Sequence, residues 1–111
     1  MTAAFNRNLL LHLNRLVRAD FDPGAFDHLA RWNARASRME MHLVARAAHE
    51  VSLGALGLRL RLRRGERLHT ENSYKLTRPA QERLLRAAGF RPERAWLDRR
   101  GWFAVHLARA C

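Results

Sequence analysis

Between His69 and Lys75 the chain concentrates polar side chains that could bind a ligand. The stretch holds a carboxylate, hydroxyls, a carboxamide, and the only tyrosine and only lysine of the chain. Glu71 and Ser73 are two residues apart, so in an extended segment both side chains leave the same face. A carboxylate accepts hydrogen bonds and a hydroxyl donates or accepts them, which suits a ligand group that carries two nitrogens. The pattern predicts a binding geometry rather than a reaction, and a polar turn at a strand end is the alternative.

The segments before this stretch alternate in the manner of β-strands. Leucines alternate with arginines from Leu56 to Leu62, which indicates a half-buried strand with an exposed arginine face. Residues 64–66 form a turn, and the next strand begins at Arg67. The sequence thus predicts a hairpin with the polar stretch at its end. The segment Ser37–Leu53 alternates too and predicts two strands joined around residues 46–48, with Met39, Met41 and Leu43 on one face.

Two histidines in this region, His42 and His49, raise the question of a metal site. Zinc is held by Cys, His or acidic ligands, four of them in structural sites and three with a water in catalytic ones. The sequence offers neither a third ligand at useful spacing nor a nearby cysteine. It therefore predicts no metal.

Helical patterns mark both ends of the chain. The range Thr2–Ala19 predicts an amphipathic helix with an apolar stripe of Phe5, Leu9, Leu13 and Leu16. Three polar residues on this helix are either site residues or solvated and loop-capping ones, namely Asn6, Asn8 and His12. Pro23 opens a short helix through about Ala30. Thr77 caps a further helix that ends at Gly89 and has a buried stripe of Ala80, Leu84, Leu85 and Ala88. A strand ending at Trp96–Leu97, a turn at 99–101 and a return strand over Trp102–Leu107 follow.

Length and composition bound the possibilities. A chain of 111 residues, 48% apolar, is one globular domain at most. No apolar run is long enough to span a bilayer, no secretory signal is visible, and the single cysteine, Cys111, has no partner for a disulfide. A cytoplasmic setting is the resulting expectation.

The net charge of +11 would attract nucleic acid or anionic lipid. All 21 basic residues except Lys75 are arginine, and they are dispersed from Arg7 to Arg109 rather than clustered. The base composition of a GC-rich genome explains this as well as a binding role does, so nucleic acid is not favoured. A standalone basic module for nucleic acid or an acidic protein remains the alternative function.

Four segments support a more specific interpretation. They are residues 2–10 (TAAFNRNLL), 38–44 (RMEMHLV), 69–75 (HTENSYK) and 88–94 (AGFRPER), the last leading to Trp96 and Asp98. In this order they resemble histidine-specific, S-adenosylmethionine-dependent methyltransferases, which trimethylate the α-amino group of histidine on the way to ergothioneine. The resemblance covers nearly the whole chain.

The resemblance implies an α+β fold that is a fragment of a Rossmann-like methyltransferase. Residues 1–75 would be part of the substrate-binding region, with helices and antiparallel strands, and 76–111 the terminal helix and β-hairpin of the Rossmann-like sheet. Glu71 and Ser73 would contact the imidazole of L-histidine or a related amino acid, and Met41 would line the pocket. Because Met1 takes an internal position of the family's longer chain and no Gly-rich loop is present, the N-terminal half that binds S-adenosylmethionine is expected to be missing and this chain alone to be inactive. A decayed remnant of such an enzyme is a third interpretation.

Overall fold

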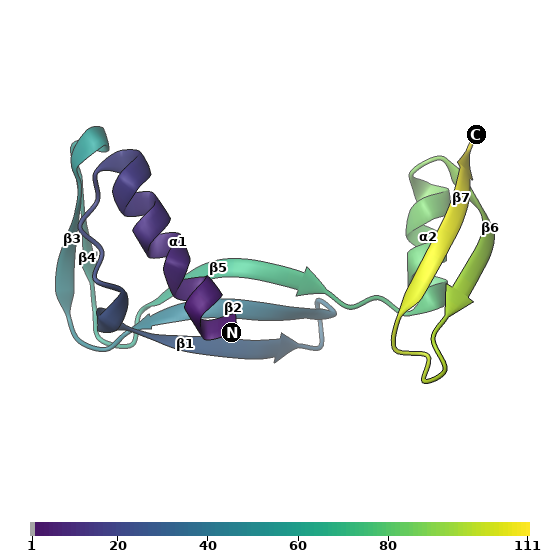
Figure 1. Cartoon of the computed structure of the whole chain (residues 1–111), viewed down its shortest axis with the longest axis horizontal. Coiled ribbons are helices and arrows are strands. Elements are labelled where there is room, and N and C mark those ends of the chain that lie inside the picture. Colours follow the sequence, from purple (N-terminus) through teal and green to yellow (C-terminus); the bar gives the residue numbers. More distant parts are fainter. Residues whose placement is uncertain (1) are drawn as a thin grey trace. The chain divides into compact units, whose positions relative to one another are not determined.

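The computed structural model describes residues 2–111 and shows an α+β protein with two helices and antiparallel sheets. The chain divides into two compact units, Met1–Tyr74 and Lys75–Cys111 (Figure 1). Neither of the two described helices is long and apolar enough to cross a membrane.

The first unit combines one helix with two small sheets. Strands β1, β2 and β5 form a three-stranded antiparallel sheet in the order β1-β2-β5, and β3 pairs with β4 in a separate hairpin. In chain order the elements are α1 (Thr2–Val17), η1 (Pro23–Ala25), β1 (Phe26–Asn33), β2 (Arg38–Ala45), β3 (His49–Leu53), η2 (Gly54–Leu56), β4 (Leu58–Leu62) and β5 (Arg67–Tyr74).

The core of this unit lies where α1 meets β1, β2 and the β3–β4 hairpin (Figure 1). Its buried apolar residues come from every one of these elements: Leu10, Phe21, Phe26, Leu43, Ala45, Val51 and Leu62. A bridge between Ala19 and Leu53 joins the segment after α1 to the end of β3. The helix is thereby held against one face of the three-stranded sheet, because burying this apolar surface is the main stabilising contribution.

The sequence correctly predicts the strands after Ser37, but it is wrong about two neighbouring elements. The expected helix from Pro23 to Ala30 is a 3-10 turn of three residues followed by β1. Phe26 is fully buried and all eight residues of β1 pair with β2, so long-range pairing overrides a short helical propensity. The expected hairpin before the polar stretch also does not form, because β4 pairs with β3 and β5 pairs with β2.

The apolar stripe expected on α1 is wrong in its position. Phe5 and Leu16 are exposed, whereas the buried residues of the helix are Asn6 and Leu10, with Leu13 partly buried on the same side. Residues 6, 10 and 13 lie on one face of a helix, and so do residues 5, 9 and 13. Periodicity alone therefore does not decide which stripe meets the sheet.

The second unit consists of α2 (Arg78–Ala87), β6 (Phe90–Leu97) and β7 (Ala104–Ala110), in the predicted order. The hydroxyl oxygen of Thr77 accepts from the Ala80 N–H at 3.3 Å, which confirms the expected N-cap. The Asp98 carboxylate accepts from the Phe103 N–H at 3.0 Å across the β6–β7 turn, and this bond lowers the pKa of Asp98. No residue of the stripe expected on α2 is fully buried: Leu84 is 55% exposed, whereas Ala80 and Leu85 are half-buried.

Candidate functional site

A β-bulge shapes the polar stretch on β5. Met41 pairs with Glu71 and the next residue, His42, pairs with His69, so Thr70 is an extra residue without a partner on β2. A bulge locally breaks the alternation of a strand and redirects a side chain. Thr70 and Glu71 are consecutive, yet both line the same pocket. The bulge is the reason that two neighbouring residues of β5 reach one site.

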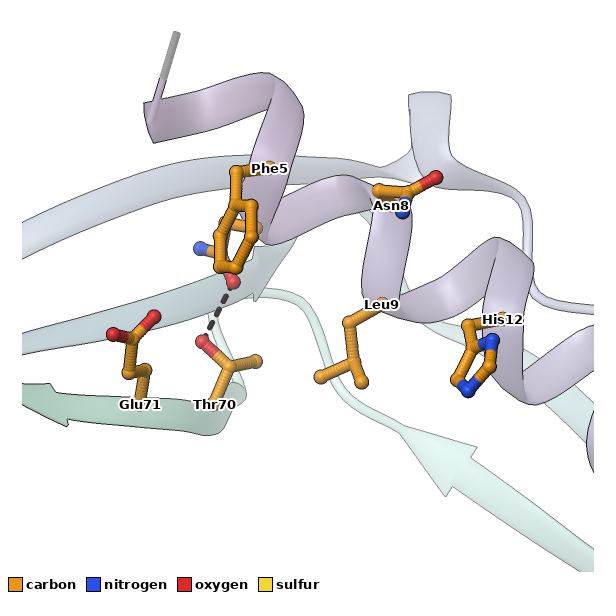
Figure 2. A pocket seen from close by; sticks show the side chains of 7 residues that line it. Phe5, Asn8, Leu9, His12, Thr70 and Glu71 are labelled. Carbon is orange, nitrogen blue, oxygen red and sulfur yellow. Dashed lines mark hydrogen bonds between the residues drawn. The ribbon is translucent and has the colours of Figure 1, made fainter.

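This pocket lies between α1 and β5 (Figure 2). Figure 2 shows Phe5, Leu9 and His12 projecting from α1 toward the side where Thr70 and Glu71 lie. Its volume is about 250 Å³, and it is lined by Phe5, Asn6, Asn8, Leu9, His12, Thr70 and Glu71. Sites for drug-sized ligands measure roughly 300–1,000 Å³. A smaller pocket with an apolar wall and one carboxylate suits a small polar ligand with a ring.

The structure places Glu71 in this pocket with its side chain exposed. Ser73 and Met41 lie outside the set of described residues that line it. The register is regular between the pairs Met41–Glu71 and Met39–Ser73, so the side chains of these four residues share one face of the sheet. Glu71 and Ser73 therefore leave the same face, as their spacing predicted.

Two residues of the pocket were not predicted, because in the sequence they look like core residues. Phe5 is 68% exposed and Leu9 is 37% exposed, and both form the apolar wall of the pocket. His12 and Asn8, which the sequence left open between site and solvent, line the pocket as well. The spacing of Phe5 and Leu9 gave no signal that could have found them, because it fits a buried stripe equally well.

Asn6 is not a solvated residue, because only 3% of its surface is exposed. Its side-chain nitrogen donates to the His42 carbonyl at 3.1 Å and lies 2.8 Å from Nδ1 of His28. Its side-chain oxygen accepts from the Thr70 hydroxyl at 2.6 Å, the bond drawn as a dashed line in Figure 2. One amide on α1 thus contacts all three strands of the sheet.

A second polar cluster occupies the other face of β2. Hydrogen bonds from Asn33, Arg38 and His42 hold the pKa of the Glu40 carboxyl at about 2, below its ordinary 4.5. The His42 and His69 rings stack with centroids 4.5 Å apart. Each of these three donors stabilises the carboxylate in its charged form.

This cluster brings together residues whose sequence spacing gave no hint of a metal site. Glu40, His42 and His69 each offer one donor atom, and these atoms lie within 4.8 Å of one another. The Glu40 carboxylate is already satisfied by three donors, and the guanidinium of Arg38 lies 2.7 Å from it, so a further cation would be repelled. His49 takes no part, since its ring packs edge-on against Phe26. The cluster is better explained as a charged network that braces the sheet.

The comparisons with known proteins agree with the resemblance of the sequence motifs. A family model described as histidine-specific methyltransferase, SAM-dependent, matches residues 1–110. A histidine N-alpha-methyltransferase of Mycobacterium tuberculosis (strain CDC 1551 / Oshkosh) is 44% identical over 108 residues, which are 97% of this chain and 34% of that protein. The enzyme of the same name from Mycolicibacterium smegmatis (strain ATCC 700084 / mc(2)155) gives the same identity and coverage. The chain spans about a third of the length of these relatives. Because the family model covers nearly every residue, the chain belongs to the histidine-specific, S-adenosylmethionine-dependent methyltransferases.

Proposed function

We propose that this chain supplies the histidine-binding part of an enzyme that transfers methyl groups from S-adenosylmethionine to the α-amino group of L-histidine. The observation that carries the proposal is the position of Glu71, an exposed carboxylate that the bulge of β5 directs into the pocket beside α1. The names of the relatives and of the family support histidine as the substrate.

The chemistry of the pocket suits an imidazole. Glu71 would accept a hydrogen bond from one ring N–H, and Ser73 on the same face would interact with the other ring nitrogen. Met41, opposite Glu71, would contact the ring from the neighbouring strand. A hydrocarbon ring of similar size would leave the carboxylate without a partner, and this cost is how such a site rejects it.

Methyl transfer needs little covalent help from the protein. The amine must be uncharged, aligned with the methyl group and shielded from water. S-adenosylmethionine supplies the methyl group when it is bound. The described residues of this chain contribute the recognition of the side chain, which places the amino group relative to the cofactor.

The described part of the chain does not fit a cofactor site of the Rossmann-like kind. Such a site lies at a Gly-rich loop between a parallel strand and a helix, and the strands described here pair antiparallel throughout. Gly54 follows β3, but its N–H donates to the Arg18 carbonyl at 3.0 Å and an added Cβ would lie 2.9 Å from that oxygen. This glycine serves close packing of the chain on itself. The cofactor-binding part would have to come from outside the described residues.

We assign residues 1–75 to the substrate-binding region and 76–111 to the terminal helix and hairpin of a Rossmann-like sheet. Apolar side chains exposed on the β6–β7 hairpin support the second assignment: Trp96, Leu97, Val105 and Leu107 are each 45% exposed or more. Strands of a sheet that is covered by helices on both faces are apolar on both sides, whereas an isolated hairpin would leave such residues exposed to water.

The test is a fusion of this chain to the part of the M. smegmatis relative that precedes the matched segment. In this fusion, Glu71→Gln should raise the KM for histidine roughly 10- to 100-fold, because a hydrogen bond to a charged group contributes about 1.5–3 kcal/mol. The dissociation constant for S-adenosylmethionine should stay within about twofold. Glu50→Gln is the matched control, since Glu50 is an exposed carboxylate on β3 paired with Arg61. Equal losses in substrate and cofactor binding on Glu71→Gln would contradict the proposal.

A further inference from the structure

The bulge that directs Glu71 is itself held by a buried amide. Asn6 has two side-chain N–H groups, and both have acceptors, the His42 carbonyl and Nδ1 of His28. Its carbonyl oxygen accepts from Thr70. The amide can adopt only this orientation, because the reversed one would set its oxygen against the His42 carbonyl. Nδ1 of His28 is then the acceptor, which places the ring proton on Nε2.

Thr70 is fixed as tightly as Asn6. Its hydroxyl has a single proton and lies 2.6 Å from the Asn6 oxygen and 3.0 Å from the Met41 carbonyl. A threonine side chain is stiff at χ1, so holding its oxygen also holds its backbone. Thr70 is the bulged residue and directly precedes Glu71.

Thr70 and Asn6 contact two backbone carbonyls of β2, those of Met41 and His42, which lie opposite the bulge. The ladder is locally disrupted at a bulge, so side-chain hydrogen bonds there help to fix its geometry. Thr70 contacts the Met41 carbonyl and Asn6 contacts the His42 carbonyl. The Asn6–Thr70 pair thus contacts the backbone of β2 on both sides of the register shift.

We propose that Asn6 and Thr70 are positioning residues: together they lock the bulge of β5 and thereby hold the Glu71 carboxylate in the pocket that Phe5 and Leu9 also line. The inference rests on the proposed role of Glu71 in binding histidine. Neither residue needs to touch the substrate's reacting amine, because they act through the backbone on either side of Thr70.

The experiment compares Thr70→Ser and Thr70→Ala in the 111-residue chain, two variants that differ from each other by one hydroxyl. In isotope-labelled protein, nuclear Overhauser effects between the Glu71 side chain and Phe5 or Leu9 report where the carboxylate lies. Titration with L-histidine reports affinity. We expect the wild type and Thr70→Ser to keep the contacts, and Thr70→Ala to lose them and to bind histidine about tenfold more weakly.

Each outcome of this experiment supports or contradicts either the positioning role or the proposed function. Retained Glu71–Phe5 contacts and unchanged affinity in Thr70→Ala would overturn the positioning role. If the wild type does not bind histidine but Thr70→Ala alone loses the contacts, the positioning role stands and the proposed function falls. Contacts between Leu10 and Leu43 serve as the folding control. If Thr70→Ala does not fold, hydrogen exchange in the wild type is measured instead. A Thr70 hydroxyl that is held by Asn6 should exchange its proton slowly with water, and rapid exchange would contradict the positioning role.

Discussion

Replacing Asn6 by alanine tests how strongly one polar contact holds the first unit together. The substitution would remove the buried side-chain donor that the His42 carbonyl and Nδ1 of His28 share, while the Thr70 hydroxyl could still turn to the Met41 carbonyl. A buried group left without a partner costs about 1–3 kcal/mol, less where water can reach it. His28 is only partly buried. We therefore expect the free energy of unfolding to fall by about 2–3 kcal/mol.

This expected loss is large compared with the total free energy of unfolding. A domain of this size has a stability of roughly 0.05–0.15 kcal/mol per residue, hence about 4–11 kcal/mol for the unit Met1–Tyr74. Asn8→Ala is the matched control, because it makes the same chemical change on the same helix at an exposed position. The helix propensity gained on replacing Asn by Ala cancels between the two variants. Asn8→Ala should change stability by no more than about 0.5 kcal/mol.

The measurement is urea unfolding followed through the methyl resonances of Leu10 and Leu43, which report the first unit alone. Whole-chain fluorescence would mix the units, since Trp32 lies in the first and two further tryptophans in the second. If Asn6→Ala and Asn8→Ala lose the same stability, the hydrogen bonds of Asn6 are not structurally important and the reasoning fails.

Two further predictions concern pH and the cofactor. The folded-state pKa of Glu40, about 2, lies below its ordinary 4.5, so its stabilising contribution is complete above about pH 4.5 and is lost as the pH falls toward 2. In urea titrations between these pH values, Glu40→Gln should weaken the loss of stability, and an unchanged slope would exclude Glu40 as a cause. Calorimetry of the 111-residue chain with S-adenosylmethionine should show no saturable heat, because the described strands lack a parallel pair and its Gly-rich loop; a micromolar binding signal would refute this.

The elements with strong local signals could be predicted from the sequence. Thr77 and Pro79 specify the start of α2, and its capping bond is present. Alternation marks β2 and β4, whose leucines and methionines occupy every second position. In each case the determining residues lie within one element, so the pattern contains the information needed to recognise it.

The pairing of these elements could not be predicted in the same way. The hairpin expected before the polar stretch is replaced by pairing of β5 with β2. Instead, two backbone hydrogen bonds hold the turn after β4 beside the end of β2. The Ala45 N–H donates to the Glu66 carbonyl at 2.9 Å, and the Gly65 N–H donates to the Ala45 carbonyl at 2.8 Å. Contacts between residues this far apart in sequence leave no periodic trace in either segment.

The bulge shows why a motif and a structure give different parts of a site. The sequence motif singles out Glu71 because a carboxylate in that stretch is what the family resemblance matches. It says nothing about Asn6, whose bond to Thr70 joins residues 64 positions apart. The sequence left Asn6 either as a site residue or as a solvated one, yet its buried side chain joins α1 to the strand that carries Glu71. A buried asparagine with every donor and acceptor satisfied is costly to place, because its amide must be desolvated. That cost is understandable if what the amide holds is the bulge, since without it β5 would regain strict alternation and Thr70 and Glu71 would point to opposite faces.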